Sequence, residues 1–427
     1  MIRALNFLFG IDSRKILLIA VFFVIAPISS FSIFGPVKFV YIGFVFLLFA
    51  YLNYSYSIKN VNIDFILFLL IISTFYSYII GGMNDFAQFI GILFSLITLA
   101  LFIRLKLNNK NISSLLLIFI TGMSISNLIV FIYLITGDTS VYETSKDGIR
   151  LVGFFSNSNF LAASQLLILP IIFQKIIESK SVKIKLVFTM LLLLSFFILI
   201  ASQSRSAIIG FVLTNLFVFT YLRYISLKRI ILSSFLISIA ILFFLLISQK
   251  FNLEFARLNP YISSGNVGLF DINLKSIEDD RLYLLESGIE TLMHYPLGLG
   301  YTDQHVITGQ LTGVYKVSHN TYLGLLVTYG IFFGLIWNGV ILSLMFFSLS
   351  LLRKLNLKID EIAVHLFVGY ISFLIYNLAH DSFNWIYFWI YSLFLYMSLQ
   401  NSRMIINQHG KIQLQSTSKT AVKMNSV

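Results

Sequence analysis

Several short polar groups interrupt a very apolar sequence, and their side chains are suited to binding an anion or moving a proton. Arg205 lies in the run Ala-Ser-Gln-Ser-Arg-Ser, and Arg281 follows two aspartates. His319 and Asn320 form a polar pair directly before an apolar, aromatic stretch that includes Tyr322. Guanidinium groups bind phosphate through paired hydrogen bonds, and a neutral imidazole can accept the proton of a hydroxyl. This combination suits a site for an anionic substrate and an acceptor hydroxyl.

The two arginines also have simpler explanations. Arg205 stands in a very short connection between apolar stretches, where a charge costs free energy unless it pairs, snorkels to lipid phosphates or faces water. Arg281 is expected in the first turn of a helix, where it is either a solvated helix-end charge or a charge that opposes the helix dipole. We prefer substrate binding for Arg205, and the unfavourable dipole favours a functional role for Arg281.

A second set of polar residues lies near expected helix ends. Arg150 precedes an apolar run, after which Asn157 and Asn159 stand at the entry of a membrane helix. These asparagines either cap that helix or form hydrogen bonds with sugar hydroxyls or a phosphate. His380 and Asp381, in the last short connection, either orient one another or cap helix ends. These five residues, together with Asn320 and Tyr322, are candidate substrate-binding residues.

The sequence predicts neither a cofactor nor a metal site. There are no cysteines, which excludes disulfides, thiolate catalysis and cysteine zinc sites. The acidic run Glu278-Asp279-Asp280 has no second carboxylate cluster or histidine pair to complete a metal site. A P-loop and a glycine-rich dinucleotide fingerprint are also absent, so ATP-driven function within this chain is not expected.

The composition indicates that these residues are positioned by membrane helices. Of 427 residues, 58% are hydrophobic and 11% are charged, with a mean hydropathy of +0.89. A soluble globular protein has about 25% charged residues. Long unbroken apolar runs favour helices over barrel strands, which would alternate apolar and polar residues. The sequence therefore predicts an all-α polytopic membrane protein and excludes both a soluble enzyme and a disordered chain.

A span needs about 20 largely apolar residues, and the chain offers about twelve such stretches. They lie near 16–35, 37–55, 63–82, 85–103, 115–136, 156–177, 184–203, 206–222, 229–248, 330–352, 362–379 and 383–400. With the N-terminus in the cytoplasm, most of the 30 basic residues fall on the cytoplasmic side, as the positive-inside rule requires. The net charge of +12 is therefore topological, with no nucleic-acid partner expected, and both termini are predicted to be cytoplasmic.

The span plan divides the chain into four parts. Residues 1–248 hold helices one to nine, 249–329 form one large outer loop with short helices, 330–400 hold helices ten to twelve, and 401–427 form a polar, disordered tail. Within the loop, apolar residues at helical spacing predict an amphipathic helix over 280–294 that lies on the membrane or the bundle. Pro296 ends that pattern and begins a tight turn over 296–300.

Together these motifs resemble the O-antigen ligase and O-antigen polymerase superfamily of bacterial envelope glycosyltransferases. The resemblance covers about 150–335 and rests on the order and spacing of its pieces. They are Arg-Leu-Val-Gly-Phe-Phe-Ser-Asn-Ser-Asn from Arg150, Ser-Arg-Ser around Arg205, Arg-Leu-Tyr from Arg281, His-Tyr-Pro-Leu-Gly-Leu-Gly from His294, His-Asn-Thr-Tyr-Leu from His319, and Gly330.

The resemblance implies a GT-C-like membrane fold and a substrate. Members take a glycan from undecaprenyl diphosphate at the periplasmic face of the bacterial inner membrane. By similarity, Arg205 and Arg281 bind the diphosphate, and His319 activates or positions the acceptor hydroxyl. The implied transfer is metal-independent and inverting. The implied partners are the undecaprenyl-diphosphate-linked oligosaccharide and membrane lipids. A polysaccharide chain-length regulator is a further candidate partner.

Three functions remain in competition. In ligases of this superfamily the His-Asn pair is followed after nine residues by a Gly-x-x-Gly-like element. Here Gly330 occupies the first glycine position, but Phe333 stands where the second small residue is expected, and Gly334 comes one residue late. This departure favours a polymerase over a ligase. A flippase for lipid-linked oligosaccharide would instead require charged or broken helices at mid-membrane. A purely structural protein would leave the outer arginines unexplained.

Overall fold

The computed structural model describes twelve segments of the chain. They are residues 32–34, 37–38, 61–104, 107–136, 142–145, 148–155, 157–221, 274–315, 319–355, 358, 361–380 and 387–404. The expected spans 16–35, 37–55 and 229–248 lie wholly or largely outside these residues, as do Asp381 and most of the tail.

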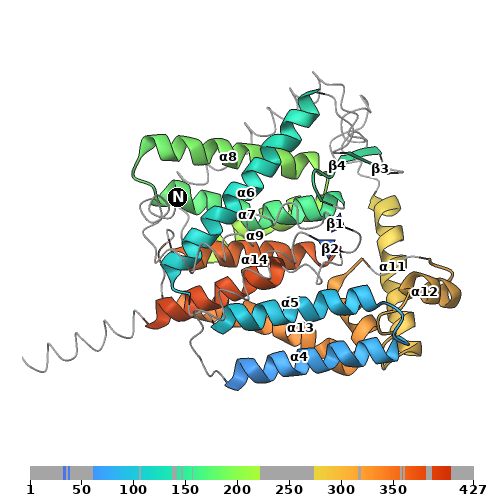
Figure 1. Ribbon diagram of the computed structural model, residues 1–427. Helices are drawn as coiled ribbons and strands as arrows, with labels where there is room; N and C mark the ends of the chain where they lie inside the picture. The colour runs from blue at the N-terminus through green and yellow to red at the C-terminus, as the bar shows by residue number, and fades with distance from the viewer. Residues whose placement is uncertain are drawn as a thin grey trace, which may run out of the picture.

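Long helices lying side by side form the body of the molecule (Figure 1). They are α4 (Val61–Ile80), α5 (Phe86–Arg104), α6 (Asn109–Thr136), α7 (Ser158–Glu178), α8 (Val182–Ala201), α9 (Arg205–Tyr221), α13 (Thr321–Leu355), α14 (Ile362–Tyr376) and the helical residues 387–404. Of the helices within the described residues, α5, α6, α7, α8 and α13 are long and apolar enough to cross a membrane. An apolar environment favours helices because they satisfy all backbone hydrogen bonds within the segment.

Nine expected spans contain a helix, with some boundaries shifted. α6 begins at Asn109, six residues before the expected start. Two short antiparallel strands, β1 (Ser32–Phe34) and β2 (Val37–Lys38), form a hairpin where the first two expected spans meet. The helical expectation is therefore wrong at this junction, where Pro36 supplies no backbone N–H for a helix.

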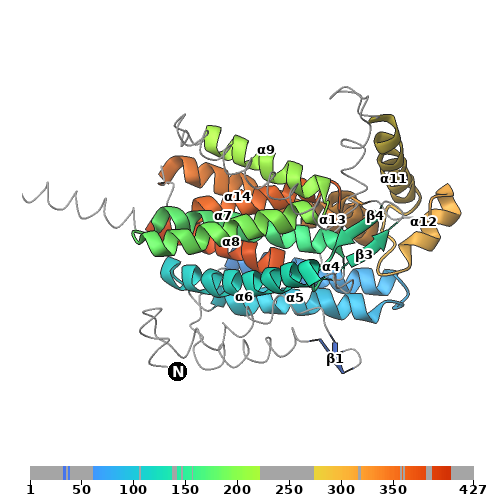
Figure 2. The ribbon, with the colours of Figure 1, turned by 90° about the horizontal axis from the view of Figure 1, so that it is seen from above.

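α7 lies at the centre of the bundle, packed against α6, α8, α9 and α14 (Figure 2). Two buried amide side chains join it to α6: Asn127 Nδ2 donates to Gln165 Oε1 at 2.9 Å, and Gln165 Nε2 donates back to Asn127 Oδ1 at 3.3 Å. Asn127 Nδ2 also lies 3.4 Å from Ser195 Oγ of α8. Polar side chains that bond across apolar helices fix their mutual register, so these contacts hold α6, α7 and α8 together.

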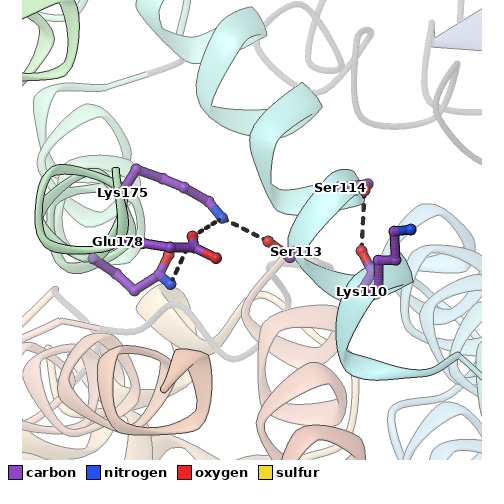
Figure 3. A network of polar contacts seen from close by, with 6 residues as sticks. Lys110, Ser113, Ser114, Lys175 and Glu178 are labelled. Carbon is purple, nitrogen blue, oxygen red and sulfur yellow. Dashed lines mark hydrogen bonds and ion pairs between the residues drawn. The ribbon is translucent and has the colours of Figure 1, made fainter. Parts of the chain in front are cut away.

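A second polar network joins the start of α6 to the end of α7 (Figure 3). Lys175 Nζ donates to Ser113 Oγ at 2.6 Å and forms an ion pair with Glu178 at 2.7 Å. Gln174 Nε2 donates to the same carboxylate oxygen at 3.1 Å. The network neutralises a largely buried lysine at the C-terminus of α7, where a cation also interacts favourably with the helix dipole.

One end of the bundle carries most of the structure outside the long helices, and we call it the loop end. β3 (Tyr142–Ser145) and β4 (Gly148–Leu151) form an antiparallel hairpin there, and α11 (Leu274–His294) and α12 (Gln304–Thr312) lie beside it (Figures 1 and 2). α11 runs roughly perpendicular to the long helices in both views. α7, α9 and the segment that starts α13 all begin at the loop end, and α14 ends there.

Candidate functional site

The site is built around a sharp break in α13. Gly330 has φ 75° and ψ 171°, a conformation that is essentially restricted to glycine, inside an otherwise helical run of 35 residues. Asn338 Nδ2 donates to the carbonyl of Tyr322 at 2.9 Å. In a straight helix these residues would be about 24 Å apart. The first segment of α13 (Thr321–Tyr329) therefore folds back against the second segment (Ile331–Leu355).

The turn expected at 296–300 holds this break in place. The backbone N–H of Ile331 donates to Pro296 O at 2.9 Å, and that of Leu299 donates to Val327 O at 2.8 Å. A Cβ atom on Gly298 would collide with the backbone N of Gly330, and a Cβ on Gly330 would collide with the backbone of the turn. The two glycines are thus needed because two backbones touch, a role that their sequence spacing alone did not indicate.

The same turn also contacts the end of α4. The N–H of Tyr301 donates to Ser77 O at 3.1 Å, and a Cβ atom on Gly300 would overlap the backbone of α4. The hydroxyls of Tyr301 and Tyr329 lie 2.7 Å apart in the buried interior. Burial raises the pKa of the Tyr301 phenol well above its usual value, with the bond to Tyr329 opposing that shift in part. Tyr301 is therefore a neutral hydrogen-bonding group that fixes the turn against α13.

The polar pair before α13 contains a helix cap. Asn320 Oδ1 accepts from the backbone N–H groups of Tyr322 at 3.0 Å and Leu323 at 3.1 Å. Its Nδ2 donates to Leu378 O at 3.1 Å, just beyond the end of α14. Asn320 thus satisfies orphan donors at the start of α13 and ties that start to α14. His319, the residue before it, is exposed.

Further hydrogen bonds fix the start of α13 on the end of α14. Thr321 N–H donates to Asn377 O at 3.0 Å, and Thr321 Oγ1 donates to His380 O at 2.7 Å. Tyr322 Oη donates to Leu374 O at 3.0 Å. Tyr322 and His380, both predicted to bind substrate, thus have contacts within the protein that fix the start of α13.

α7 joins the same cluster through its first turn. Asn157 Oδ1 accepts from Phe160 N–H at 2.9 Å, so Asn157 is the N-cap of α7, as the alternative interpretation of its position expected. Tyr376 Oη of α14 donates to the carbonyl of Asn159 at 3.0 Å, and its ring stacks on that of His380 at 4.6 Å. The motif of Asn157 and Asn159 and the motif of His319 and Asn320 are more than 150 residues apart in sequence. Both therefore contact the end of α14.

Arg205 is the first residue of α9 and follows a buried polar turn. Ser202, Gln203 and Ser204 are buried. The backbone of Gln203 has φ 54°, which is uncommon for a residue other than glycine. A Cβ atom on Gly210 would lie 2.8 Å from Ser372 O, so α9 packs closely on α14. Because the two helices run in opposite directions, Arg205 lies about 7.5 Å along the axis from this contact, toward the loop end. His380 lies beyond the same contact in that direction.

The structure gives only the element in which Arg150 and Arg281, two further predicted site residues, lie. Arg150 lies in β4, with Glu143 as its Cα partner across the hairpin. Arg281 is in α11, which begins at Leu274 and not at residue 280. The expectation that Arg281 opens this helix is therefore wrong, because seven helical residues precede it. Asp381 lies outside the described residues.

Asn338, Thr321 and Tyr376 are structural contributors that the sequence did not single out. Asn338 lies within an apolar run, and its polar character was the only available signal. Its Oδ1 atom is buried, in a side chain 8% exposed. Within the described ranges, no group of three His, Asp or Glu side chains is close enough to hold a metal ion. The site assembled from these ranges thus offers an imidazole, hydroxyls, amides and a guanidinium.

Comparison with known proteins finds one family model that matches the part of the chain containing this site. Residues 190–338 match the family described as O-antigen ligase, a range that includes Arg205, Arg281, His319 and the break at Gly330. A comparison with curated proteins found no match. The apolar helices and this match together indicate a multi-pass inner-membrane protein. The match over residues 190–338 supports the resemblance to the O-antigen ligase and O-antigen polymerase superfamily.

Proposed function

We propose that this protein is a polymerase of O-antigen or a related surface polysaccharide. It transfers a growing glycan from undecaprenyl diphosphate to a sugar hydroxyl on another lipid-linked repeat unit. The observation that carries this proposal is the anchoring of His319: Asn320 and Thr321 fix the start of α13 on the end of α14, and leave the histidine exposed beside them. An exposed side chain on a rigid support is suited to meeting a substrate at the loop end.

In the proposed reaction His319 accepts the proton of the acceptor hydroxyl. The hydroxyl oxygen attacks the anomeric carbon as the bond from that carbon to the diphosphate oxygen breaks, which inverts the anomeric centre. The diphosphate leaves with the electron pair, and Arg205 and Arg281 stabilise its charge. Since guanidinium groups form paired hydrogen bonds with phosphate, arginine is better suited to this role than lysine.

The proposal includes a location for the reaction. With twelve spans and both termini in the cytoplasm, the loop end faces the periplasm. The described helices alternate in direction as the span plan requires, since α4, α6, α8 and α14 run toward the loop end and α5, α7 and α9 run away from it. Arg150, Asn157, Asn159, Asn320, Tyr322, His380 and Asp381 are then proposed to border the bound glycan or to support the residues that do. A chain-length regulator is a proposed partner on this face.

A ligase that transfers the glycan to lipid A-core is the second candidate. It is favoured by the description of the matching family and by Gly330, which occupies the expected position after the His-Asn pair. Gly334 also has a packing role, because a Cβ atom there would lie 2.7 Å from Leu326 Cα. The late glycine thus supports the same folded-back α13 and weakens the sequence argument against a ligase.

Deleting the gene separates the two enzymes. Loss of a polymerase leaves a single repeat unit attached to the lipid A-core, whereas loss of a ligase removes every O-chain band from the lipopolysaccharide gel. Complementation with the wild-type gene restores the ladder in either case. A full ladder in the deletion strain, together with unchanged capsule and other envelope polymers, would contradict both. Accumulated lipid-linked units on the cytoplasmic side alone would instead indicate a flippase.

A further inference from the structure

α11 has three distinct faces, and the most apolar of them is exposed. The face toward the protein consists of small or polar residues together with Leu284, and includes Ser287, Gly288 and Thr291. Leu282, Ile289 and Met293 lie on the opposite side with 52%, 41% and 78% of their surface exposed. An ordinary surface helix buries its apolar face and exposes its polar one, so this arrangement is inverted.

The small face is firmly held by the protein. α11 packs against α12 and the first part of α13, and Thr291 Oγ1 lies 3.4 Å from Thr308 Oγ1 of α12. Ser287 and Thr291 direct their hydroxyls to carbonyls of their own helix, which lets them lie buried without unsatisfied donors. α11 is therefore held in a fixed orientation, and its exposed apolar stripe points in a defined direction.

The apolar stripe of α11 is followed by further exposed apolar residues on the turn and on the second segment of α13. Beyond Met293, Leu297 is 67% exposed, and the bond from Ile331 N–H to Pro296 O places this turn beside the second segment of α13. Phe332, the next residue of that segment, is exposed and apolar, as a lipid-facing residue would be. The exposed apolar surface thus runs from the span across the turn to α11.

The orientation of α11 fits the boundary between lipid and water. It lies across the loop end, roughly perpendicular to the spans (Figures 1 and 2). Glu286 and Glu290 occupy a third, exposed face beside the apolar stripe. A helix with one apolar and one charged face lies in the membrane interface, with the apolar side buried about 5–10 Å and the charged side in water.

We propose that α11 is an interfacial helix whose apolar stripe (Leu282, Leu285, Ile289 and Met293) binds the acyl chains of the leaflet at the loop end. The partner is the lipid surface itself, to which the stripe is joined through Leu297 and the second segment of α13. The depth of α11 in the leaflet then fixes the turn at 296–300, and through that turn the break in α13. This inference concerns the placement of α11 and does not depend on which glycan is transferred.

The absence of cysteines makes a direct test straightforward. Single-cysteine variants Ile289→Cys and Met293→Cys carry a polarity-sensitive fluorophore, with Glu286→Cys and Glu290→Cys as matched controls on the same helix. Each full-length protein is placed in nanodiscs of phosphatidylethanolamine and phosphatidylcholine at one copy per disc. We expect blue-shifted emission at Ile289 and Met293 that is quenched several-fold more by brominated acyl chains than at the glutamate positions. Water-soluble iodide should quench in the opposite order.

Two outcomes would overturn the proposal. Equal and strong quenching by iodide at all four positions would mean that the stripe faces water. A blue shift at Ile289 and Met293 without quenching by brominated lipid would mean that protein covers the stripe. Repeating the measurement at two copies per disc would then show whether a second copy of the chain is that cover. Neither outcome would bear on the proposed transfer reaction, which is assayed separately.

Discussion

Individual asparagines at the loop end show how far a polar residue can be understood from its neighbours in sequence. Asn157 caps α7, and local sequence was sufficient to expect this, since the residue directly precedes an apolar helical run. Asn320 also caps a helix, yet its bond to Leu378 joins residues 58 positions apart. That contact depends on the packing of α13 against α14, which no local pattern encodes.

Asn157→Ala is expected to affect stability and leave the chemistry largely intact. Losing the cap should cost about 1 kcal/mol of unfolding free energy, because the N–H of Phe160 loses its acceptor. Asn157→Asp keeps an acceptor and should restore the loss. Thermal unfolding in detergent and glycan transfer by the same preparations would measure both effects. A large loss of transfer at unchanged stability would show that Asn157 contacts the substrate.

The contribution of Arg205 to the rate of transfer should depend on the shape of its guanidinium as well as on its charge. If it forms paired hydrogen bonds with the diphosphate, Arg205→Lys should slow transfer by about 10-fold or more and Arg205→Ala further, since a charge-assisted bond contributes about 1.5–3 kcal/mol. The matched control is Arg403→Lys, an exposed arginine in the last helix. Equal activity of the lysine and wild-type proteins would show that Arg205 only snorkels to lipid phosphates.

At the scale of whole elements, the least predictable feature is the start of α13. The apolar pattern placed a span from residue 330, but the helix begins at Thr321 and reverses at Gly330. Residues 321–329 are apolar enough for a helix, so their helical state was accessible from sequence. The reversal was not, because it is stabilised by backbone contacts with the turn at 296–300, and those contacts join segments about 30 residues apart.

Replacing the glycine at this reversal should unfold the site. Gly330→Ala places a side chain at φ 75° and drives its Cβ into the backbone at Leu297, which should cost at least about 2 kcal/mol. Gly339→Ala is the control, because a Cβ there meets nothing within 4 Å and alanine is favoured in a helix. Thermal unfolding should show a lowered midpoint only for Gly330→Ala. An unchanged midpoint would mean that α13 is not reversed at this residue.

Over the whole molecule, composition predicted the class of fold because lipid leaves few alternatives. Apolar stretches of span length had to become helices, and nine expected spans contain one within the described ranges. The central position of α7 could not be predicted, since lipid-facing and buried apolar residues have similar compositions. The convergence of Arg205, His319 and His380 on one end of the bundle follows from alternating span directions, whereas their depth and mutual contacts required the packed structure.

The orientation of the molecule can be tested with single cysteines. Ser181→Cys lies in the exposed connection between α7 and α8, and Gln310→Cys lies on the exposed side of α12 at the loop end. Following the positive-inside rule, a membrane-impermeant maleimide added to intact spheroplasts should label Gln310→Cys alone. Labelling of Ser181→Cys should require permeabilised membranes. The reverse pattern would place the site in the cytoplasm and exclude the proposed reaction.

The most direct test of the proposed site is transfer by purified His319→Ala in proteoliposomes supplied with lipid-linked repeat units. The wild-type protein should extend the glycan. His319→Ala should extend it at least about 100-fold more slowly, the usual contribution of a general base, with an unchanged thermal unfolding midpoint. Arg403→Lys, outside the site, serves as a control that retains activity. Normal chain extension by His319→Ala at equal protein would contradict the assignment of the start of α13 as the catalytic centre.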